Sequence, residues 1–395
     1  MSRAMGTDAR HGVILATHYW TVGPASALDE YLRHRANAYL FIAHPLFDEG
    51  RDAYYQRWQD GVQTDSRKFP GIHGLARFFG DVVRTVRWIG RARHYELFVA
   101  GDNLLALAGL YLRLRGRVRW VVLYTIDFVP RRFSNPVLNW AYRAIDRFAV
   151  RHVDAIWNAA EGIAKGRRQR DGGMAMAPNL VVPVGARVAH ARQRADESVR
   201  TRDVVYLGHL LEKQGVQIVI EAMPRILEVL PGTRFLVIGD GPHMEALRAL
   251  AHRVGASHAI EFMGESLDHE LIEQRLCACS VGVAPYVTEP SNYSQFTDLP
   301  GKVKNYLACG LATVMTDVPG HAADVEAAGA GRVVPYDATA QADAIIAYLT
   351  DDALLARTSK AATAMAAPFD WDHIFDAAFQ ETEPLLAAGR GGQGR

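Results

Sequence analysis

Short apolar runs alternate with longer amphipathic segments along the first half of the chain. The runs predict buried strands, and the segments between them, whose apolar positions recur every three or four residues, predict helices. The expected strands are residues 13–17, 38–43, 97–100, 120–124 and 155–158, and the expected helices are residues 25–35, 103–114 and 136–150. Strands separated by helices favour a parallel sheet with crossover helices.

The second half repeats this alternation more clearly. Strands are expected at residues 204–207, 235–238, 260–263, 281–284 and 312–315, with helices at 217–229, 243–254 and 300–308. We therefore expect an α/β protein of two Rossmann-like, doubly wound parallel-sheet domains that face a cleft, with ligands at the carboxyl ends of the strands. A polar stretch at 193–201 places the boundary between residues 1–195 and residues 196–388, and the glycine-rich residues 389–395 predict a disordered tail.

Composition narrows the class of protein. The 395 residues are 49% hydrophobic and 22% charged, which excludes a mainly disordered chain. No apolar run reaches the ~18–20 residues of a spanning helix, and the first run, 13–16, is too short for a signal peptide. Three cysteines do not make a disulfide framework, so we expect a cytoplasmic protein, and we interpret the isolated pair Cys277 and Cys279 as part of a helix.

The near-neutral total conceals two oppositely charged halves. Residues 1–195 hold 29 Lys and Arg against 16 Asp and Glu, whereas residues 196–395 hold 15 against 27. A basic half indicates an anionic partner, such as nucleic acid or an anionic membrane face, unless its arginines are simply solvated. Residues 73–93 combine a wide apolar face with five arginines. Such a segment fits a helix on a membrane surface or a helix packed on its own domain, and the leucine and phenylalanine content favours packing.

Two glycine-containing segments follow strands of the second half. The first is GHLLEKQG, where Gly208 would let a ligand approach the backbone and His209 and Lys213 could meet a phosphate. A surface lysine beside a turn is the alternative. The second, residues 239–242 (GDGP), resembles half of a dinucleotide fingerprint, but a plain turn explains it equally well.

Residues 297–305 (TDLPGKVKN) are the most informative segment. Asp298 is expected to cap a helix with Pro300 in its first turn, and Gly301 leaves room for a ligand. A helix start attracts anions, and Lys302 adds a full positive charge there. Asn305 shares a helix face with Lys302 and could bond a sugar hydroxyl. An ordinary capped helix is the alternative.

Other candidates follow further strands. Glu265 and Tyr286 come after the strands at 260–263 and 281–284, where they would contact a donor nucleotide or merely pack. Asp127 follows the strand at 120–124 and could accept a proton from an attacking hydroxyl, although a turn before a proline is equally consistent. His18 and Trp20, at the end of the first strand, could bind an acceptor or pack in a core.

These segments together resemble glycosyltransferases of the GT-B architecture. Gly208 to Gly215 is similar to the G-R-x-x-x-x-K-G element of glycosyltransferase family 4, with His209 at the arginine position and Lys213 at the lysine. The E-x7-E element of that family falls on Thr297 and Asn305 here, so the retaining machinery of the family is not matched.

The segment GVAPYVTEP…TDLPGKVKNYLACGLATV resembles the xanthan-type glucuronosyltransferase, an inverting GT-B enzyme that acts on a lipid-linked oligosaccharide at the inner membrane face. This resemblance implies a nucleoside contact at Glu265 and a catalytic base at Asp127. It further implies donor contacts at Tyr286, Lys302 and Asn305.

The resemblance implies transfer of a sugar from a nucleotide-sugar, UDP-linked, to a lipid-linked saccharide in polysaccharide or glycolipid biosynthesis. No metal and no separate cofactor are expected, because Lys302 and the helix dipole can neutralise the leaving diphosphate. The basic half suits an anionic membrane surface, and we do not expect nucleic acid as a partner. A GT-B nucleotide-sugar epimerase and a non-catalytic sugar-nucleotide-binding protein remain alternatives.

Overall fold

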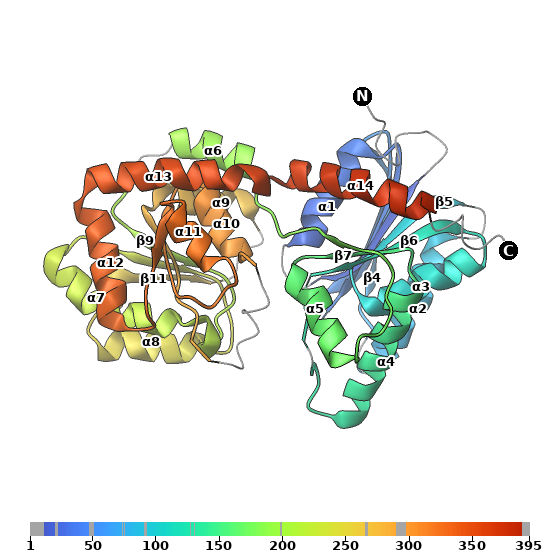
Figure 1. Ribbon diagram of the computed structural model, residues 1–395, viewed down its shortest axis with the longest axis horizontal. Coiled ribbons are helices and arrows are strands. Elements are labelled where there is room, and N and C mark those ends of the chain that lie inside the picture. The colour runs from blue at the N-terminus through green and yellow to red at the C-terminus, as the bar shows by residue number, and fades with distance from the viewer. Residues whose placement is uncertain are drawn as a thin grey trace. The chain divides into compact units, whose positions relative to one another are not determined.

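The computed structural model describes residues 12–19, 23–46, 51–72, 74, 76–90, 93–126, 128–129, 131–197, 200–264, 268–289 and 298–388. The chain forms two compact units, one of Met1–Val184 with Trp371–Arg395 and one of Gly185–Asp370 (Figure 1). Over the described residues, no helix combines the length and apolar character needed to cross a membrane. The predicted tail 389–395 lies outside them.

The domain boundaries expected from the sequence differ from these units. The polar stretch at 193–201 does not separate them, because its first part belongs to α6 (Val188–Glu197). Val188 and Ala191 of that helix are buried in the core of the second unit. At the other end, α14 (Trp371–Ala388) returns to the first unit, where Phe375 and Phe379 are buried in its core.

The first unit is built on one eight-stranded sheet in the order β4-β3-β2-β1-β5-β6-β7-β8. All neighbouring pairs in the run β2-β1-β5-β6-β7-β8 are parallel, as predicted. The strands are β1 (Val13–Tyr19), β2 (Ala38–Pro45), β3 (Asp52–Gln59), β4 (Val62–Pro70), β5 (Tyr95–Ala100), β6 (Val118–Thr125), β7 (Ala155–Asn158) and β8 (Asn179–Val181).

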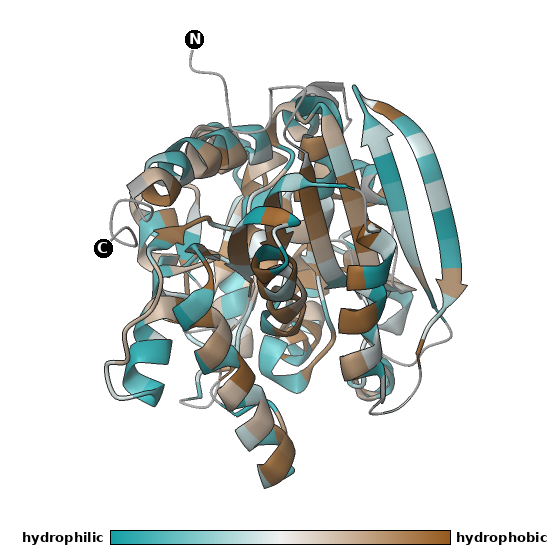
Figure 2. Ribbon diagram, turned by 90° about the vertical axis from the view of Figure 1, so that its right-hand side faces the viewer, coloured by the Kyte–Doolittle hydropathy of each residue, from teal (hydrophilic) through white to brown (hydrophobic). Residues whose placement is uncertain are grey.

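The hairpin of β3 and β4 was not predicted from the sequence. It pairs antiparallel with β2 at one edge of the sheet, where its two strands are coloured mostly as hydrophilic (Figure 2). Most β4 side chains are exposed. An edge strand that faces water on both sides needs no apolar alternation, so the hydrophobic pattern gives no signal for it.

Helices cover both faces of this sheet. On one face α2 (Ala76–Ile89), α3 (Asn103–Leu114) and α4 (Pro136–His152) share one apolar cluster, to which Ile89, Leu105 and Ala149 contribute. On the other face the cluster includes α1 (Pro24–Arg35) and α14. A further helix, α5 (Glu161–Arg170), follows β7. The expectation that the segment 73–93 packs on its own domain is confirmed for the buried side of α2.

The described part of the second unit has six strands, all parallel, in the order β11-β10-β9-β12-β13-β14. The strands are β9 (Val204–Leu207), β10 (Phe235–Ile238), β11 (Ile260–Gly264), β12 (Val281–Ala284), β13 (Ala312–Met315) and β14 (Gly331–Val333). Its helices besides α6 are α7 (Val216–Val229), α8 (Met244–Arg253), α9 (His269–Ala278), α10 (Gly301–Ala308), α11 (Ala322–Ala327), α12 (Ala338–Thr350) and α13 (Asp352–Ala366). Every strand expected here from the sequence is present. Cys277, Cys279 and Cys309 are buried free thiols.

Candidate functional site

The candidate donor site lies where the strand order of the second sheet reverses. The chain moves outward from β9 to β10 and β11, and then returns to the other side of β9 with β12. Connections leave such neighbouring strands in opposite directions, which opens a crevice at their carboxyl ends. Gly208 follows β9, and Tyr286 follows β12 by two residues, so both predicted positions lie at this point.

Glycines let the backbone segments at this edge approach one another closely. Gly208 and Gly239 have φ angles of +137° and +143°, which side-chain-bearing residues rarely adopt. A Cβ atom on Gly239 would lie 1.9 Å from the Gly208 carbonyl oxygen. Gly215 has a φ of +78°, and a Cβ atom there would lie 1.6 Å from the carbonyl oxygen of Pro285. The glycines of both predicted segments are therefore sterically required.

Lys302 reaches back from α10 to the turn after β9. Its Nζ atom donates hydrogen bonds to the Tyr206 hydroxyl at 2.9 Å and to Gln214 Oε1 at 2.7 Å. The ammonium lies 4.2 Å from the ring centroid of Tyr206 and 4.9 Å from that of Tyr286. A Cβ atom on Gly208 would lie 3.2 Å from Nζ. Lys302 is thus held against the backbone of the glycine turn.

Among the described residues, no anionic group compensates the charge of Lys302. No carboxylate among the described residues forms an ion pair with it, and burial lowers the pKa of Lys302 to about 7. Neutral oxygens and tyrosine rings stabilise an ammonium less than an anion would. An entering diphosphate would supply the missing opposite charge, so this geometry suits anion binding.

The start of α10 differs in two respects from the prediction. Pro300 is the N-cap residue, not part of the first turn, and no side chain of the described residues caps the helix. Asp298 therefore does not cap it; its carbonyl oxygen accepts from the His321 amide at 3.0 Å, and its carboxylate lies 4.0 Å from His321 Nε2. Prolyl geometry already sets the helix entry, so a side-chain cap is dispensable. The uncapped start leaves this end of the helix to a ligand.

The remaining predicted residues have different places. Asn305 donates from Nδ2 to the Gly301 carbonyl at 3.0 Å, so this amide N–H serves the helix itself. The carbonyl oxygens of His209 and Lys213 accept from the Tyr206 hydroxyl at 3.1 Å and the Val287 amide at 3.1 Å. The turn after β9 is thereby bonded to the segment after β12. Donor-binding roles for these side chains stay predictions.

Three predicted residues, Trp20, Asp127 and Glu265, lie outside the described residues, and their roles stay predictions. Tyr206 and Gln214 are the residues that the sequence reasoning missed. Tyr206 lies inside an apolar strand, where nothing distinguishes it from a core residue. Gln214 stands beside Lys213, and the charged neighbour was the more conspicuous phosphate ligand.

His18 belongs to a buried ion cluster in the first unit. Nδ1 lies 2.6 Å from Asp102 Oδ2, and Nε2 lies 3.4 Å from Asp81 Oδ2. Burial alone would lower the pKa of His18, but Asp102 and Asp81 together raise it to about 9. Asp81 also faces His44 Nδ1 at 3.2 Å, which ties α2 to the ends of β1 and β2. Both ring nitrogens of His18 thus face carboxylates, and acceptor binding by His18 stays a prediction.

Comparison with known proteins finds similarity to glycosyltransferases. Residues 201–351 match the family model described as glycosyl transferases group 1. D-inositol 3-phosphate glycosyltransferase of Corynebacterium jeikeium is 27% identical over 232 residues, which cover 54% of this chain and 53% of that protein. Phosphatidyl-myo-inositol mannosyltransferase of Mycobacterium tuberculosis is 24% identical over 194 residues, 48% of each chain. The chain therefore matches about half the length of these curated relatives.

Solved structures match nearly the whole chain. Sucrose-phosphate synthase of Thermosynechococcus elongatus has a TM-score of 0.69 at 18% identity, covering 96% of this chain and all of that one. Anabaena HepE, crystallised in complex with UDP, has a TM-score of 0.66 at 16% identity, covering 95% of this chain and 99% of that one. The chain thus has the fold of the GT-B glycosyltransferases, and its second unit is matched by the group 1 glycosyl transferases.

Proposed function

We propose that this protein is a glycosyltransferase that moves a sugar from a UDP-linked donor to a hydroxyl group of a lipid-linked saccharide. The observation that carries the proposal is the Lys302 ammonium, which is held at the uncapped start of α10 beside Gly208 with no carboxylate partner among the described residues. Family membership of the second unit and the fold support the same reaction class.

Transfer breaks the bond between the anomeric carbon and the donor phosphate oxygen, so negative charge develops on the leaving diphosphate. Lys302 and the N-terminal end of α10 would stabilise that charge, because both present fixed positive potential where it forms. This electrostatic device takes the role that a metal ion has in other transferases. The acceptor hydroxyl attacks the anomeric carbon and passes its proton to a base, for which Asp127 is the candidate.

The basic first half supports an anionic acceptor. Its excess of lysine and arginine suits a lipid diphosphate at the cytoplasmic face of a membrane, where the protein would be peripheral. The names of two relatives point to inositol-based acceptors, one of them a phosphatidyl lipid. A polysaccharide or glycolipid pathway would use such a product.

A thermal-shift panel tests the donor. UDP, GDP and their glucose, glucuronate and mannose derivatives are compared on the wild type, Lys302→Ala, and Lys360→Ala as a control on an exposed lysine of the same unit. A ligand at ~100 times its dissociation constant stabilises by ~3 kcal/mol. We expect a shift with UDP-sugars in the wild type and the control, which Lys302→Ala loses. GDP is included because one relative is named GDP-mannose-dependent. No shift with any nucleotide would contradict the proposal.

Turnover separates a transferase from the alternatives. The selected donor is incubated with a lipid diphosphate-linked saccharide, and glycosylated lipid and free UDP are measured. A transferase forms both only when the acceptor is present. An epimerase changes the donor without the acceptor, and a pure binding protein changes neither.

A further inference from the structure

Exposed apolar side chains gather on three helices of the first unit. Among the described residues, ten large hydrophobic side chains are exposed, and seven of them belong to α2, α3 and α4. The most exposed are Leu114 at 84%, Phe79 at 77% and Trp140 at 71%. The others on these helices are Val83, Tyr111, Val137 and Phe148. Isolated exposed apolar residues are ordinary, but a concentration on neighbouring elements indicates an interaction surface.

These helices form one layer. All three contribute to the same core cluster on one face of the sheet, and α3 contacts both α2 and α4. Their outer sides therefore make one continuous surface, which we call the α2–α4 face.

On α4 the exposed apolar residues follow a regular spacing. Val137, Trp140, Ala144 and Phe148 are all exposed and recur at intervals of three or four residues. This spacing places them along one side of the helix. The hydropathy colouring shows brown turns on this helix, the lowest in the view (Figure 2). The opposite side of α4 is buried through Asp146, Ala149 and Val150, so the exposed apolar residues are not the ones that pack on the core.

The charge on the α2–α4 face has one sign. Its helices carry seven arginines, namely Arg77, Arg84, Arg87, Arg113, Arg143, Arg147 and Arg151. Their only acidic residues, Asp81 and Asp146, are 2% and 1% exposed. Asp81 faces His18 and His44, and Asp146 pairs with Arg167 and Arg170. No carboxylate of these helices is therefore presented to an approaching partner.

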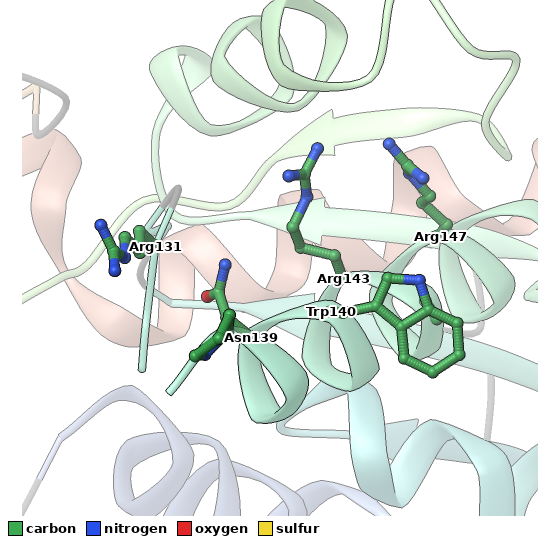
Figure 3. A pocket seen from close by; sticks show the side chains of 7 residues that line it. Arg131, Asn139, Trp140, Arg143 and Arg147 are labelled. Atoms are coloured by element: carbon green, nitrogen blue, oxygen red, sulfur yellow. The ribbon is translucent and has the colours of Figure 1, made fainter. Parts of the chain in front are cut away.

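A pocket beside α4 concentrates this positive charge. It has a volume of about 340 Å³ and is lined by Arg131, Pro136, Asn139, Trp140, Arg143, Ala144 and Arg147. Figure 3 shows the side chains of Arg143 and Arg147 extending in the same direction from α4, with Arg131 beyond Asn139. Asp171 forms an ion pair with Arg147 at 2.9 Å and another with Arg170. Arg143 lies 3.8 Å from the same carboxylate, so three arginines share Asp171 and the pocket keeps an excess of positive charge for an anion.

We propose that the α2–α4 face docks this protein on an anionic lipid bilayer. The arginines would meet headgroup phosphates, with the α4 pocket seating one of them, while the phenylalanine, leucine and tryptophan side chains enter the interfacial layer. Amphipathic helices with arginines beside aromatic and leucine side chains bind membranes in this way. Tryptophan and tyrosine prefer the headgroup level.

The chemistry of the face disfavours other partners. A second copy of the chain would place arginines against arginines, because a two-fold interface pairs a patch with itself. A nucleic acid would account for the arginines but would leave Leu114 and Phe79 without a role. An anionic bilayer satisfies both the charge and the apolar side chains.

Docking would bring the first unit to lipid-linked acceptors, so this inference adds a membrane surface to the proposed function. The docking itself requires neither a bound donor nor turnover. Flotation with vesicles and nucleotide thermal shifts therefore fail independently. If nucleotide shifts are normal and flotation fails, only the docking inference is refuted. If flotation succeeds without nucleotide binding, only the donor proposal is refuted.

The experiment is flotation of the full chain with vesicles of phosphatidylglycerol and phosphatidylcholine, against pure phosphatidylcholine. The apolar variant is Phe79→Ser, Leu114→Ser, Trp140→Ser. Its matched control is Val62→Ser, Val181→Ser, Val229→Ser, three exposed apolar residues outside the face. The charge variant is Arg87→Gln, Arg151→Gln, which removes two exposed arginines. All the substituted side chains are exposed, and circular dichroism confirms folding of each variant.

We expect binding to the anionic vesicles only. The apolar variant should lose at least about tenfold in partition constant, since binding scales with buried apolar area, and its control should match the wild type. The charge variant should lose roughly 20- to 30-fold at low salt, because each arginine near an anionic surface contributes about a fivefold factor.

Several outcomes overturn the inference. These are absence of binding, equal binding to neutral vesicles, and equal losses in the apolar variant and its control. Self-association that the apolar variant abolishes, seen by sedimentation velocity without vesicles, would assign the face to a second copy. Binding that depends on the arginines but not on the apolar residues would assign it to a polyanion.

Discussion

The low pKa of Lys302 predicts that nucleotide-sugar binding takes up a proton. Burial lowers the pKa of Lys302 to about 7 in the unliganded protein, so the side chain is half neutral at pH 7 and mostly neutral at pH 9. A diphosphate bound against the ammonium favours its charged form and returns the pKa toward its ordinary value. UDP-glucose is the suitable probe, because its diphosphate is a diester with no titration in this range.

The magnitude follows from the charged fraction of Lys302. With a pKa of about 7 the charged fraction falls from about one half at pH 7 to about one hundredth at pH 9, so affinity for UDP-glucose should fall about 50-fold over this range. At pH 8 binding should take up about 0.9 proton. Isothermal titration calorimetry at pH 7, 8 and 9, in two buffers of different ionisation enthalpy, measures both quantities.

Lys302→Arg provides the matched control, because a guanidinium stays charged throughout this range. Any binding that this variant retains should be independent of pH and should take up no proton. A wild-type affinity that changes less than about threefold between pH 7 and 9, with no proton uptake, would refute the reasoning.

Three further predictions concern stability and the ion cluster. Gly215→Ala should lower the free energy of unfolding by at least about 2 kcal/mol in urea titrations. The new Cβ atom would collide with the Pro285 carbonyl. Gly255→Ala is the control, because Gly255 has a similar φ of +74° but open space around it, and it should lower the free energy of unfolding less. Equal losses in the two variants would contradict the collision. Phe379→Ala should destabilise the first unit by about 3–5 kcal/mol, because Phe379 is 2% exposed in its core. Limited proteolysis should then degrade this unit first. Simultaneous loss of residues 185–370 would contradict this prediction. The His18 ring should titrate near pH 9 in NMR spectra. Because the folded state holds this proton more tightly than the unfolded state, the stabilisation from His18 is complete below about pH 6.5 and disappears as the pH rises through 9. Asp102→Asn should lower the pKa of His18, and an unchanged value would be inconsistent with the cluster.

Local sequence patterns predicted most of the helices and strands and one segment of the candidate site. Buried parallel strands are apolar over their whole length, so runs such as 204–207 and 281–284 could be read directly. Helix starts also have local signals. Pro300, Gly301 and Lys302 together predicted an anion site, and the structure places these three residues at the crevice of the second sheet. Both signals depend on neighbours within a few residues, so they can be recognised from the sequence without the tertiary structure.

Contacts between residues far apart in the sequence depend on the packing of the whole chain and could not be predicted. Lys302 contacts Tyr206 and Gln214, 96 and 88 positions away, because the strand order places the turn after β9 beside the start of α10. The return of α14 to the first unit is likewise invisible locally, since an amphipathic helix does not specify which core will bury it. The α2–α4 face required the structure for the same reason: a sequence shows that an apolar side chain is present, but only packing decides whether it is buried or remains exposed.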